Sequence, residues 1–322
     1  MQLTKKGKPM NYRKDLISLS FLLLFFFSSN ITCETHTTKP PKIVGLVPVR
    51  NEAPIIAQCL RALACYTDAI VVLDDASVDA TVAVVKSIQK ECNVERIIEK
   101  EIWYRDEPGD RNKLLRAGRE IGGTHFISVD ADELFTANCR ENNFLRNKIL
   151  SMQPGDYLSF NLISLWKGIG QYRNDGNFVI KEIAFCDDGY CFFESGFIHT
   201  LRRPGNLIDG KEIKIFPRET YGILHFDRVN WDNVLIKTIW YKCMERIRLP
   251  EKSIGRINYF YKRWTDETGI QLYPSPKEWF DGYEFFDASV YNYKDVWREN
   301  QIKQWVRAYG QEYFEGLGFM LV

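Results

Sequence analysis

Four carboxylate side chains follow two apolar runs of the sequence and could bind a divalent cation and a nucleotide. Asp130 and Asp132 lie one residue apart directly after the run 126–129, and Asp74 and Asp75 follow the run 69–73. Hard carboxylate oxygens suit Mg²⁺ or Mn²⁺, and such a pair can hold the ion against a diphosphate. A D-x-D triplet alone is equally compatible with a solvated acidic turn. Its position in the fold must therefore distinguish a metal site from such a turn.

The elements around these acids have the pattern of a parallel sheet. Apolar runs of β type alternate with helical patterns, at 43–47, 69–73, 94–98 and 126–129 for the strands. Helices are expected around Ile56 to Leu63, after Ser77 or Asp79 as a cap, and from Arg111 to Ile121. Ligands bind at the carboxyl ends of parallel strands, so the polar residues after each strand should meet at one edge.

The second half has a different character. Runs 157–163 and 178–185 predict strands, residues 231–247 predict a helix, and aromatic residues become dense beyond Gly255. Packing over the sheet is favoured for these aromatic residues over lining an acceptor groove. The sequence therefore predicts an α/β fold with a Rossmann-type, mostly parallel central sheet flanked by helices, followed by a C-terminal helical, aromatic-rich extension. The expected parts are 1–41, 42–250 and 251–322.

The first of these parts has the layout of a signal peptide or a signal-anchor. Basic residues precede an apolar stretch within 16–31, and a Thr/Pro linker follows it. The stretch is short for a membrane span, which favours a cleaved signal, and possible membrane association through 16–31 stays open. The expected location is the lumen of the secretory pathway or a membrane, or the cytoplasmic side of the membrane in a bacterium.

Composition excludes some classes of partner and site. The net charge of +1 argues against a broad nucleic-acid-binding face, which needs an excess of Lys and Arg. The eight cysteines show no paired CxxC spacing, so a zinc site is not expected. Cys186 and Cys191 flank a DDGY turn, where a disulfide and two buried thiols are alternatives.

Two other enzyme classes lack their motifs. A dinucleotide-dependent oxidoreductase needs G-x-G-x-x-G after the first strand, where this chain has VPVRNE. A sugar nucleotidyltransferase usually has a Gly-rich loop with Arg and Lys at that point, and this loop is also absent.

Four blocks of the sequence together resemble the inverting family 2 glycosyltransferases, which have the GT-A fold. They are VGLVPVRNE (44–52), AIVVLDDASVDAT (69–81), DRNKLLRAGREIGGTHFISVDADE (110–133) and, more weakly, ILHFDRVNW (223–231). The resemblance extends over about 43–245. The DADE ending is similar to members that act on the lipopolysaccharide core.

This resemblance implies roles for particular residues. The loop from Pro48 through Arg50 to Glu52 would hold the nucleotide base, and Asp74 or Asp75 would contact the base or the ribose. The other implied roles are diphosphate binding by Arg111, ribose or metal binding by Asp130, and metal binding by Asp132 and by His225. The implied cofactor is Mn²⁺ or Mg²⁺, the favoured donor is a UDP-sugar, and the acceptor is a glycan or a lipid-linked hydroxyl compound.

The implied reaction is a single displacement with inversion, in which a general base takes the proton of the acceptor hydroxyl. The clear Glu-Asp pair of many relatives is missing, which leaves Asp187, Asp188 and Glu194 as candidates for the general base, with His199 as a further candidate catalytic residue near the acceptor. Glu194 is preferred because it lies in FFESGFIHT beside His199. An ordinary polar role at a strand edge is the alternative for each, and a catalytically silent protein that binds a glycan or a protein partner is the alternative for the whole chain.

Overall fold

The structure is a computed structural model that describes residues 40–174, 179–194, 201–207, 210–215 and 221–319. The compact unit Lys39–Val322 contains every helix and strand within these ranges. The predicted signal or anchor segment and His199 lie outside the described residues, and the three-part division of the chain stays a prediction. Within the described ranges, no helix has both the length and the apolar character needed to cross a membrane.

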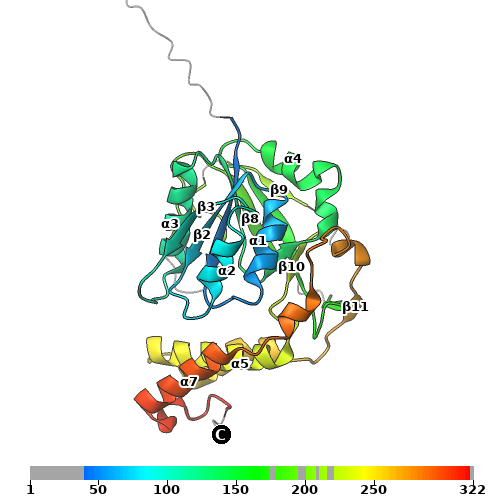
Figure 1. Cartoon of the computed structure of the whole chain (residues 1–322). Coiled ribbons are helices and arrows are strands. Elements are labelled where there is room, and N and C mark those ends of the chain that lie inside the picture. The colour runs from blue at the N-terminus through cyan, green and yellow to red at the C-terminus, as the bar shows by residue number, and fades with distance from the viewer. Residues whose placement is uncertain (1–39, 175–178, 195–200, 208–209, 216–220, 320–322) are drawn as a thin grey trace, which may run out of the picture. The chain divides into compact units, whose positions relative to one another are not determined.

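A sheet of nine strands forms the centre of the described part of the chain (Figure 1). The strands run in the order β3-β2-β1-β4-β8-β6-β10-β5, and β9 pairs with β6 beside β10. Five of the eight strand pairings described are parallel, so the predicted mostly parallel α/β fold is confirmed. The strand bounds are β1 Ile43–Val49, β2 Ala69–Asp74, β3 Val94–Glu99, β4 His125–Ser128, β5 Glu133–Phe135, β6 Tyr157–Ser164, β8 Val179–Cys186, β9 Glu212–Lys214 and β10 Ile223–His225.

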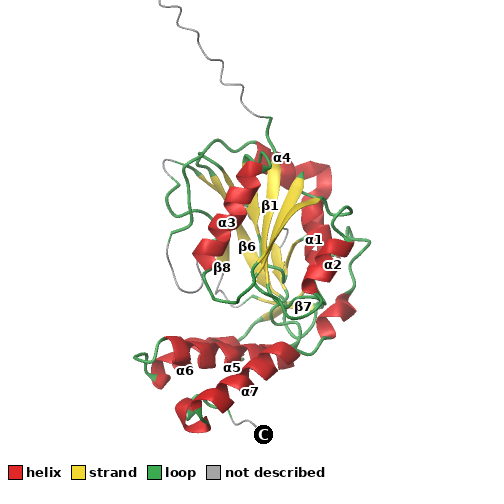
Figure 2. Cartoon of the chain, turned by 60° about the vertical axis from the view of Figure 1, so that its left-hand side comes forward, coloured by secondary structure: helices red, strands yellow, loops and turns green. Residues whose placement is uncertain are grey.

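Helices cover both faces of the parallel half of the sheet. Alternate residues of a strand point to opposite faces, so Val47 packs with α1 (Ile56–Ala64) and Leu46 with α3 (Glu107–Glu120). Figure 2 shows α1 and α3 on opposite sides of the strands. A glycine is needed where α1 approaches most closely, because a Cβ at Gly45 would lie 2.5 Å from Leu63 Cδ2. The shorter helices are α2 (Thr81–Ser87) and α4 (Phe144–Leu150).

The helix α3 begins four residues earlier than the sequence analysis expected. The Asp106 carboxylate accepts a hydrogen bond from the Gly109 N–H at 3.0 Å and so caps the helix, and Pro108 fits its first turn. The end is as predicted, because Gly122 adopts a φ of 86° just beyond the last turn. The earlier start brings Asp106, Glu107 and Asp110 to the same end of the sheet as the strand termini.

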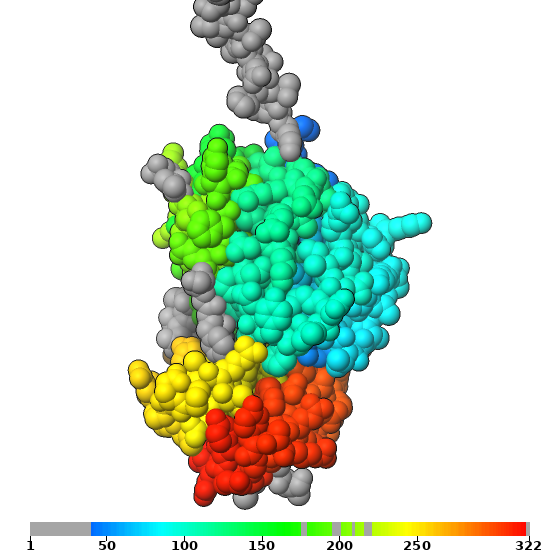
Figure 3. All heavy atoms as spheres, turned by 90° about the vertical axis from the view of Figure 1, so that its left-hand side faces the viewer, coloured from blue at the N-terminus to red at the C-terminus, as the bar shows by residue number. Residues whose placement is uncertain are grey.

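Three C-terminal helices form a layer with an apolar core of its own. They are α5 (Trp231–Arg248), α6 (Ile254–Thr265) and α7 (Val296–Tyr309), and their most extensive contacts are with one another. Trp240, Met244, Ile257, Tyr261 and Ile302 fill this core. In the space-filling view, the atoms coloured yellow and red in the C-terminal part lie against each other (Figure 3). The helical C-terminal extension predicted from the sequence is therefore present, and the layer also includes α5.

The remaining described elements are short. The strands β7 (Gln171–Arg173) and β11 (Leu272–Pro274) form a separate two-stranded sheet. Four 3₁₀ helices are described, η1 (Ala137–Asn143), η2 (Lys277–Trp279), η3 (Ala288–Asn292) and η4 (Gln311–Phe314). Cys186 and Cys191 are both free thiols, and the Cys191 Sγ donates to Asp187 Oδ1 at 3.2 Å. Of the two alternatives for this pair, the structure has two buried thiols and not a disulfide.

Candidate functional site

A cavity of about 250 Å³ lies where β1, β2 and β4 end. These strands are parallel neighbours, so the residues that follow them meet at one edge of the sheet, as the sequence predicted. Among the predicted site residues, those that line the cavity are Pro48, Arg50, Glu52, Asp75, Arg111, Asp130 and Asp132. Asp74 does not line it, because its carboxylate is buried and accepts a hydrogen bond from the Ser77 N–H at 2.9 Å.

The loops after β1 and β2 hold each other in place. The Arg50 guanidinium donates to the backbone carbonyls of Asp75 and Ala76, and it lies 4.8 Å from the centre of the Trp103 ring. Asn51 has a φ of 52°, which this residue type tolerates better than most, and its side-chain oxygen accepts a hydrogen bond from the Val78 N–H. The two loops therefore form one rigid wall of the cavity.

Asp75 is one of two carboxylates held by a single lysine. The Lys100 Nζ lies 2.5 Å from Asp75 Oδ1 and 2.9 Å from Asp110 Oδ2. Burial raises the pKa of Asp75 above its ordinary value, although Lys100 acts in the opposite direction. No residue in the described part of the chain donates a hydrogen bond to the second Asp75 oxygen, which could therefore accept one from a base or a ribose hydroxyl.

Two arginines neutralise Asp130 from different elements. Arg111, on α3, lies 3.1 Å from Asp130 Oδ1, and Arg202 lies 2.7 Å from Asp130 Oδ2. Burial acts to raise the pKa of Asp130, but Arg202 and Arg111 outweigh it and lower this pKa to about 2. Arg202 also pairs with Glu133, whose side chain is fully buried. Asp130 is therefore ionised and held in place by its neighbours.

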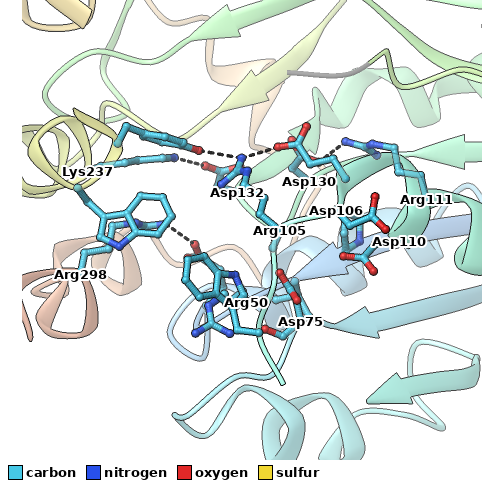
Figure 4. Close-up of a pocket in the computed structure, with 18 of the residues that line it drawn as sticks. Arg50, Asp75, Arg105, Asp106, Asp110, Arg111, Asp130, Asp132, Lys237 and Arg298 are labelled. Carbon is cyan, nitrogen blue, oxygen red and sulfur yellow. Dashed lines mark hydrogen bonds and ion pairs between the residues drawn. The ribbon is translucent and has the colours of Figure 1, made fainter. Parts of the chain in front are cut away.

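Asp132 faces a different set of groups. Its Oδ2 lies 3.3 Å from the Lys237 Nζ and 3.5 Å from the His225 Nε2. Burial acts to raise the pKa of Asp132, but Lys237 and His225 outweigh it, so the pKa lies well below its ordinary value. Figure 4 shows Lys237 and Arg111 approaching the acidic pair from opposite sides.

The ring of His225 lies between two carboxylates. Asp227 Oδ1 lies 3.1 Å from His225 Nδ1, so the other ring nitrogen, Nε2, is directed towards Asp132. Burial lowers the pKa of His225, but Asp227 and Asp132 outweigh this effect and leave the pKa above its ordinary value. A histidine that ligates a metal usually has such a partner on its second nitrogen.

The donor set here fits a divalent cation. Ligand atoms of Asp132, Glu133 and His225 lie within 4.8 Å of one another. Glu133 is fully buried against Arg202, so Asp132 and His225 are the two members that could give a cation an oxygen and a nitrogen, although Asp132 Oδ2 is itself paired with Lys237. One carboxylate oxygen and one imidazole nitrogen suit Mn²⁺, and carboxylates alone suit Mg²⁺.

The C-terminal helical layer supplies the remaining wall of the cavity. Lys237, Trp240 and Tyr241 come from α5, and Trp297 and Arg298 from α7. These residues were not predicted from the sequence as part of the site, and neither were Lys181 and Arg202. A signal was present in the aromatic density of the C-terminal part, but the residues singled out there mostly pack. Tyr261 and Trp279 are fully buried, but only Trp279 packs with the core of the sheet as expected, because Tyr261 lies in the core of the helical layer.

The candidate catalytic residues lie elsewhere. Asp188 accepts hydrogen bonds from the N–H groups of Tyr190 and Cys191 and so stabilises the DDGY turn. Glu194 is exposed, and neither Glu194 nor Asp188 is among the residues that line the cavity. His199 lies outside the described residues. The catalytic role of these three residues stays a prediction.

Glu52 predicts a pH effect on stability. Burial raises the pKa of Glu52 to about 7, although the Arg298 guanidinium 3.7 Å away acts in the opposite direction. The folded protein therefore keeps a proton on Glu52 that the unfolded chain loses near its ordinary value of 4.5. The contribution of protonated Glu52 to the stability of the folded protein is complete below about pH 4.5, and it is lost as the pH rises to about 7.

We expect the variant Glu52→Gln to lose less stability than the wild type between pH 5 and pH 8. The difference should be on the order of 2 kcal/mol, since one pKa unit corresponds to about 1.4 kcal/mol. Urea denaturation at pH 5, 6, 7 and 8 measures it. Parallel stability curves for the two proteins would show that Glu52 titrates alike in the folded and unfolded states.

Comparisons with known proteins show that part of the chain that forms this site matches a known family. No curated protein matches the chain. Among solved structures, S. aureus TarS 1-349 matches over 86% of this chain and 81% of its own, with 14% identity and a TM-score of 0.36. The mannosyltransferase PcManGT from Pyrobaculum calidifontis, in complex with GDP-Man and Mn²⁺, has 26% identity over 40% of this chain and 36% of its own, with a TM-score of 0.30.

A third similar structure is glucosyl-3-phosphoglycerate synthase from Mycobacterium tuberculosis, in complex with Mn²⁺, UDP and glucosyl-3-phosphoglycerate. It has 19% identity over 39% of this chain and 44% of its own, with a TM-score of 0.27. The match therefore spans less than half the length of the mannosyltransferase and of the synthase. Residues 46–142, the segment that carries Arg50, Asp75, Arg111, Asp130 and Asp132, match the family Glycosyl transferase family 2.

Proposed function

We propose that this protein is a metal-dependent glycosyltransferase that moves a sugar from a nucleoside diphosphate sugar to a hydroxyl group. One observation carries the proposal. Asp130 and Asp132 line the same cavity as Arg111 and the loop after β1, at the carboxyl ends of three parallel strands. The match of residues 46–142 to a glycosyltransferase family supports it.

Asp130, Asp132 and His225 would have different roles in binding the cation. Asp132 and His225 would hold it directly, and Asp227 would keep the His225 ring in place. Asp130 would stay beside them, with Arg111 within reach of the diphosphate. When bound, Mn²⁺ or Mg²⁺ would neutralise negative charge on the departing diphosphate.

The opposite end of the cavity suits the nucleoside. Asp75 is fixed by Lys100 and can accept a hydrogen bond from a base or a ribose hydroxyl. Arg50 and Glu52 border the same space, with the Trp103 ring against Arg50. We propose UDP-sugars as the favoured donors; of the similar structures reported above, one is a complex with UDP and another is a complex with GDP-Man.

The finer features of the reaction are also proposals. We propose a single displacement with inversion, a hexosyl group as the transferred sugar, and a glycan or a lipid-linked compound as the acceptor. Activity on the lipopolysaccharide core follows only from the DADE motif that ends at Glu133. Glu194, Asp188 and His199 remain the proposed candidates for the general base.

The test is an assay of nucleotide release (UDP, GDP or CMP) by the full chain, across a panel of UDP-, GDP- and CMP-sugars. We expect turnover with one donor class in Mn²⁺ or Mg²⁺, its loss in EDTA, and its recovery when the metal is restored. Hydrolysis of the donor without an acceptor is sufficient for detection. Nucleotide binding that EDTA does not change, with no turnover of any donor, would instead indicate a silent binding protein.

A further inference from the structure

The ammonium group of Lys237 contacts the oxygen with which Asp132 would bind a metal ion. Its Nζ is 3.3 Å from Asp132 Oδ2, and His225 Nε2 is 3.5 Å from the same oxygen. Both side chains are largely buried, with 20% of Lys237 and 17% of Asp132 exposed. The positive charge of Lys237 therefore already neutralises Asp132, at the same oxygen that faces His225.

A lysine in this position must compete with a divalent cation. Both are positive, and at the few ångströms that separate them from one carboxylate oxygen they repel each other strongly in a partly buried site. Asp132 is the one hydrogen-bond partner that the described part of the chain gives to the Lys237 ammonium. Binding of a cation by Asp132 therefore requires the ammonium to find another anion.

Other cations of the cavity are fixed in a way that Lys237 is not. Arg298 is paired with Asp295, and Arg202 is held by Glu133 as well as Asp130. Lys237 has a flexible stem and a single partner, so its ammonium can move by rotation of its side chain alone. A diphosphate in the same cavity would give it a new partner of higher negative charge.

We propose that Lys237 is an exchangeable counter-ion of Asp132, which leaves it for a diphosphate oxygen of the nucleotide as Asp132 binds a divalent cation. This inference rests on the proposed function, because it assumes a nucleoside diphosphate in the cavity. It means that the free protein binds metal weakly, and that nucleotide and metal strengthen each other's binding. Such coupling is reciprocal, so either ligand can be used to measure it.

The test is a titration of the full chain with Mn²⁺, with and without UDP or GDP. Electron paramagnetic resonance measures the concentration of free Mn²⁺ at each point. Without nucleotide, we expect Lys237→Met to bind Mn²⁺ about tenfold more tightly than the wild type. Lys237→Arg keeps the charge and should bind like the wild type. Addition of nucleotide should raise Mn²⁺ affinity less in Lys237→Met than in the wild type. In the wild type the nucleotide both contributes oxygen ligands to the ion and draws Lys237 away from Asp132, and the variant lacks the second effect.

Lys181 provides the matched control, because it lines the same cavity without a described contact to Asp132. We expect Lys181→Met to change Mn²⁺ affinity by less than about threefold, since only the general field of the cavity changes. Circular dichroism verifies that each variant is folded. Equal gains in Lys181→Met and Lys237→Met, or no gain in Lys237→Met, would overturn the inference.

Failure of the inference can be told from failure of the proposed function. If wild type and Lys237→Met bind Mn²⁺ with nucleotide but equally well without it, only the exchange of Lys237 is overturned. If neither protein binds Mn²⁺ at millimolar concentration with either nucleotide, the metal-dependent function is overturned as well.

Discussion

Replacing Asp132 with asparagine lowers kcat/KM for sugar transfer by about 10³-fold, if Asp132 holds the cation. Asparagine keeps the size of the side chain but removes the negative charge that the pair of Asp132 and His225 offers. The stabilisation of a departing diphosphate by a metal amounts to several kcal/mol, and about 1.4 kcal/mol corresponds to a factor of ten. Steady-state release of nucleoside diphosphate, with Mn²⁺ varied, measures the effect.

The control for Asp132→Asn is Asp266→Asn, which removes a carboxylate at the end of α6 outside the cavity. This variant should keep wild-type kcat/KM. Because Lys237 loses its ion-pair partner in Asp132→Asn, the melting temperature should be measured beside the activity. A folded Asp132→Asn protein with more than a tenth of wild-type activity would exclude Asp132 as a necessary metal ligand.

Replacing Arg202 with methionine lowers the free energy of unfolding by about 3–5 kcal/mol, the cost of leaving a buried charge without its partner. Glu133 is fully buried, and apart from Arg202 its carboxylate accepts the Asp130 N–H at 3.0 Å. Without Arg202, Asp130 keeps the guanidinium of Arg111, but Glu133 has no other ion-pair partner among the described residues. Urea denaturation at pH 7.5 measures the loss.

The double variant Arg202→Met/Glu133→Gln separates the charge effect from a loss of packing. We expect it to recover at least half of the lost stability, because the glutamine carries no charge that needs a partner. The neighbouring Arg203 lies 4.2 Å from the centre of the Tyr157 ring, and Arg203→Met should change stability by about 1 kcal/mol or less. No recovery in the double variant would contradict the role of the Glu133 charge.

The parallel half of the fold could be predicted because its signals are local. The strands β1 and β2 are almost entirely apolar runs, and Ile56, Leu60 and Leu63 repeat at helical spacing. The general rule on the carboxyl ends of parallel strands then placed Arg50 and Asp132 together without any knowledge of side-chain contacts. The start of α3 was missed because a Pro-Gly pair suggests a turn, whereas Asp106 caps a helix there.

The other wall of the cavity could not be predicted in this way. Lys237 lies 105 positions from its partner Asp132, and Arg202 lies 69 positions from Glu133. The periodicity of α5 predicts a helix, but it does not say which turn faces the acids, because that depends on packing against α6 and α7. Asp188 shows a local role that its sequence could have suggested, because an aspartate side chain often accepts a backbone N–H two residues on in a turn, as Asp188 does from Tyr190. Its catalytic role stays a prediction.

The separate apolar core of the C-terminal layer has a consequence for how this protein could change. Lys237 and Arg298 are carried by helices that pack mainly on one another, whereas Asp130 and Asp132 follow a strand of the central sheet. Substitutions inside the helical layer can shift the cations while the acids stay where they are. Directed evolution towards a different donor could therefore target α5 and α7 as one library, with residues 43–135 held constant.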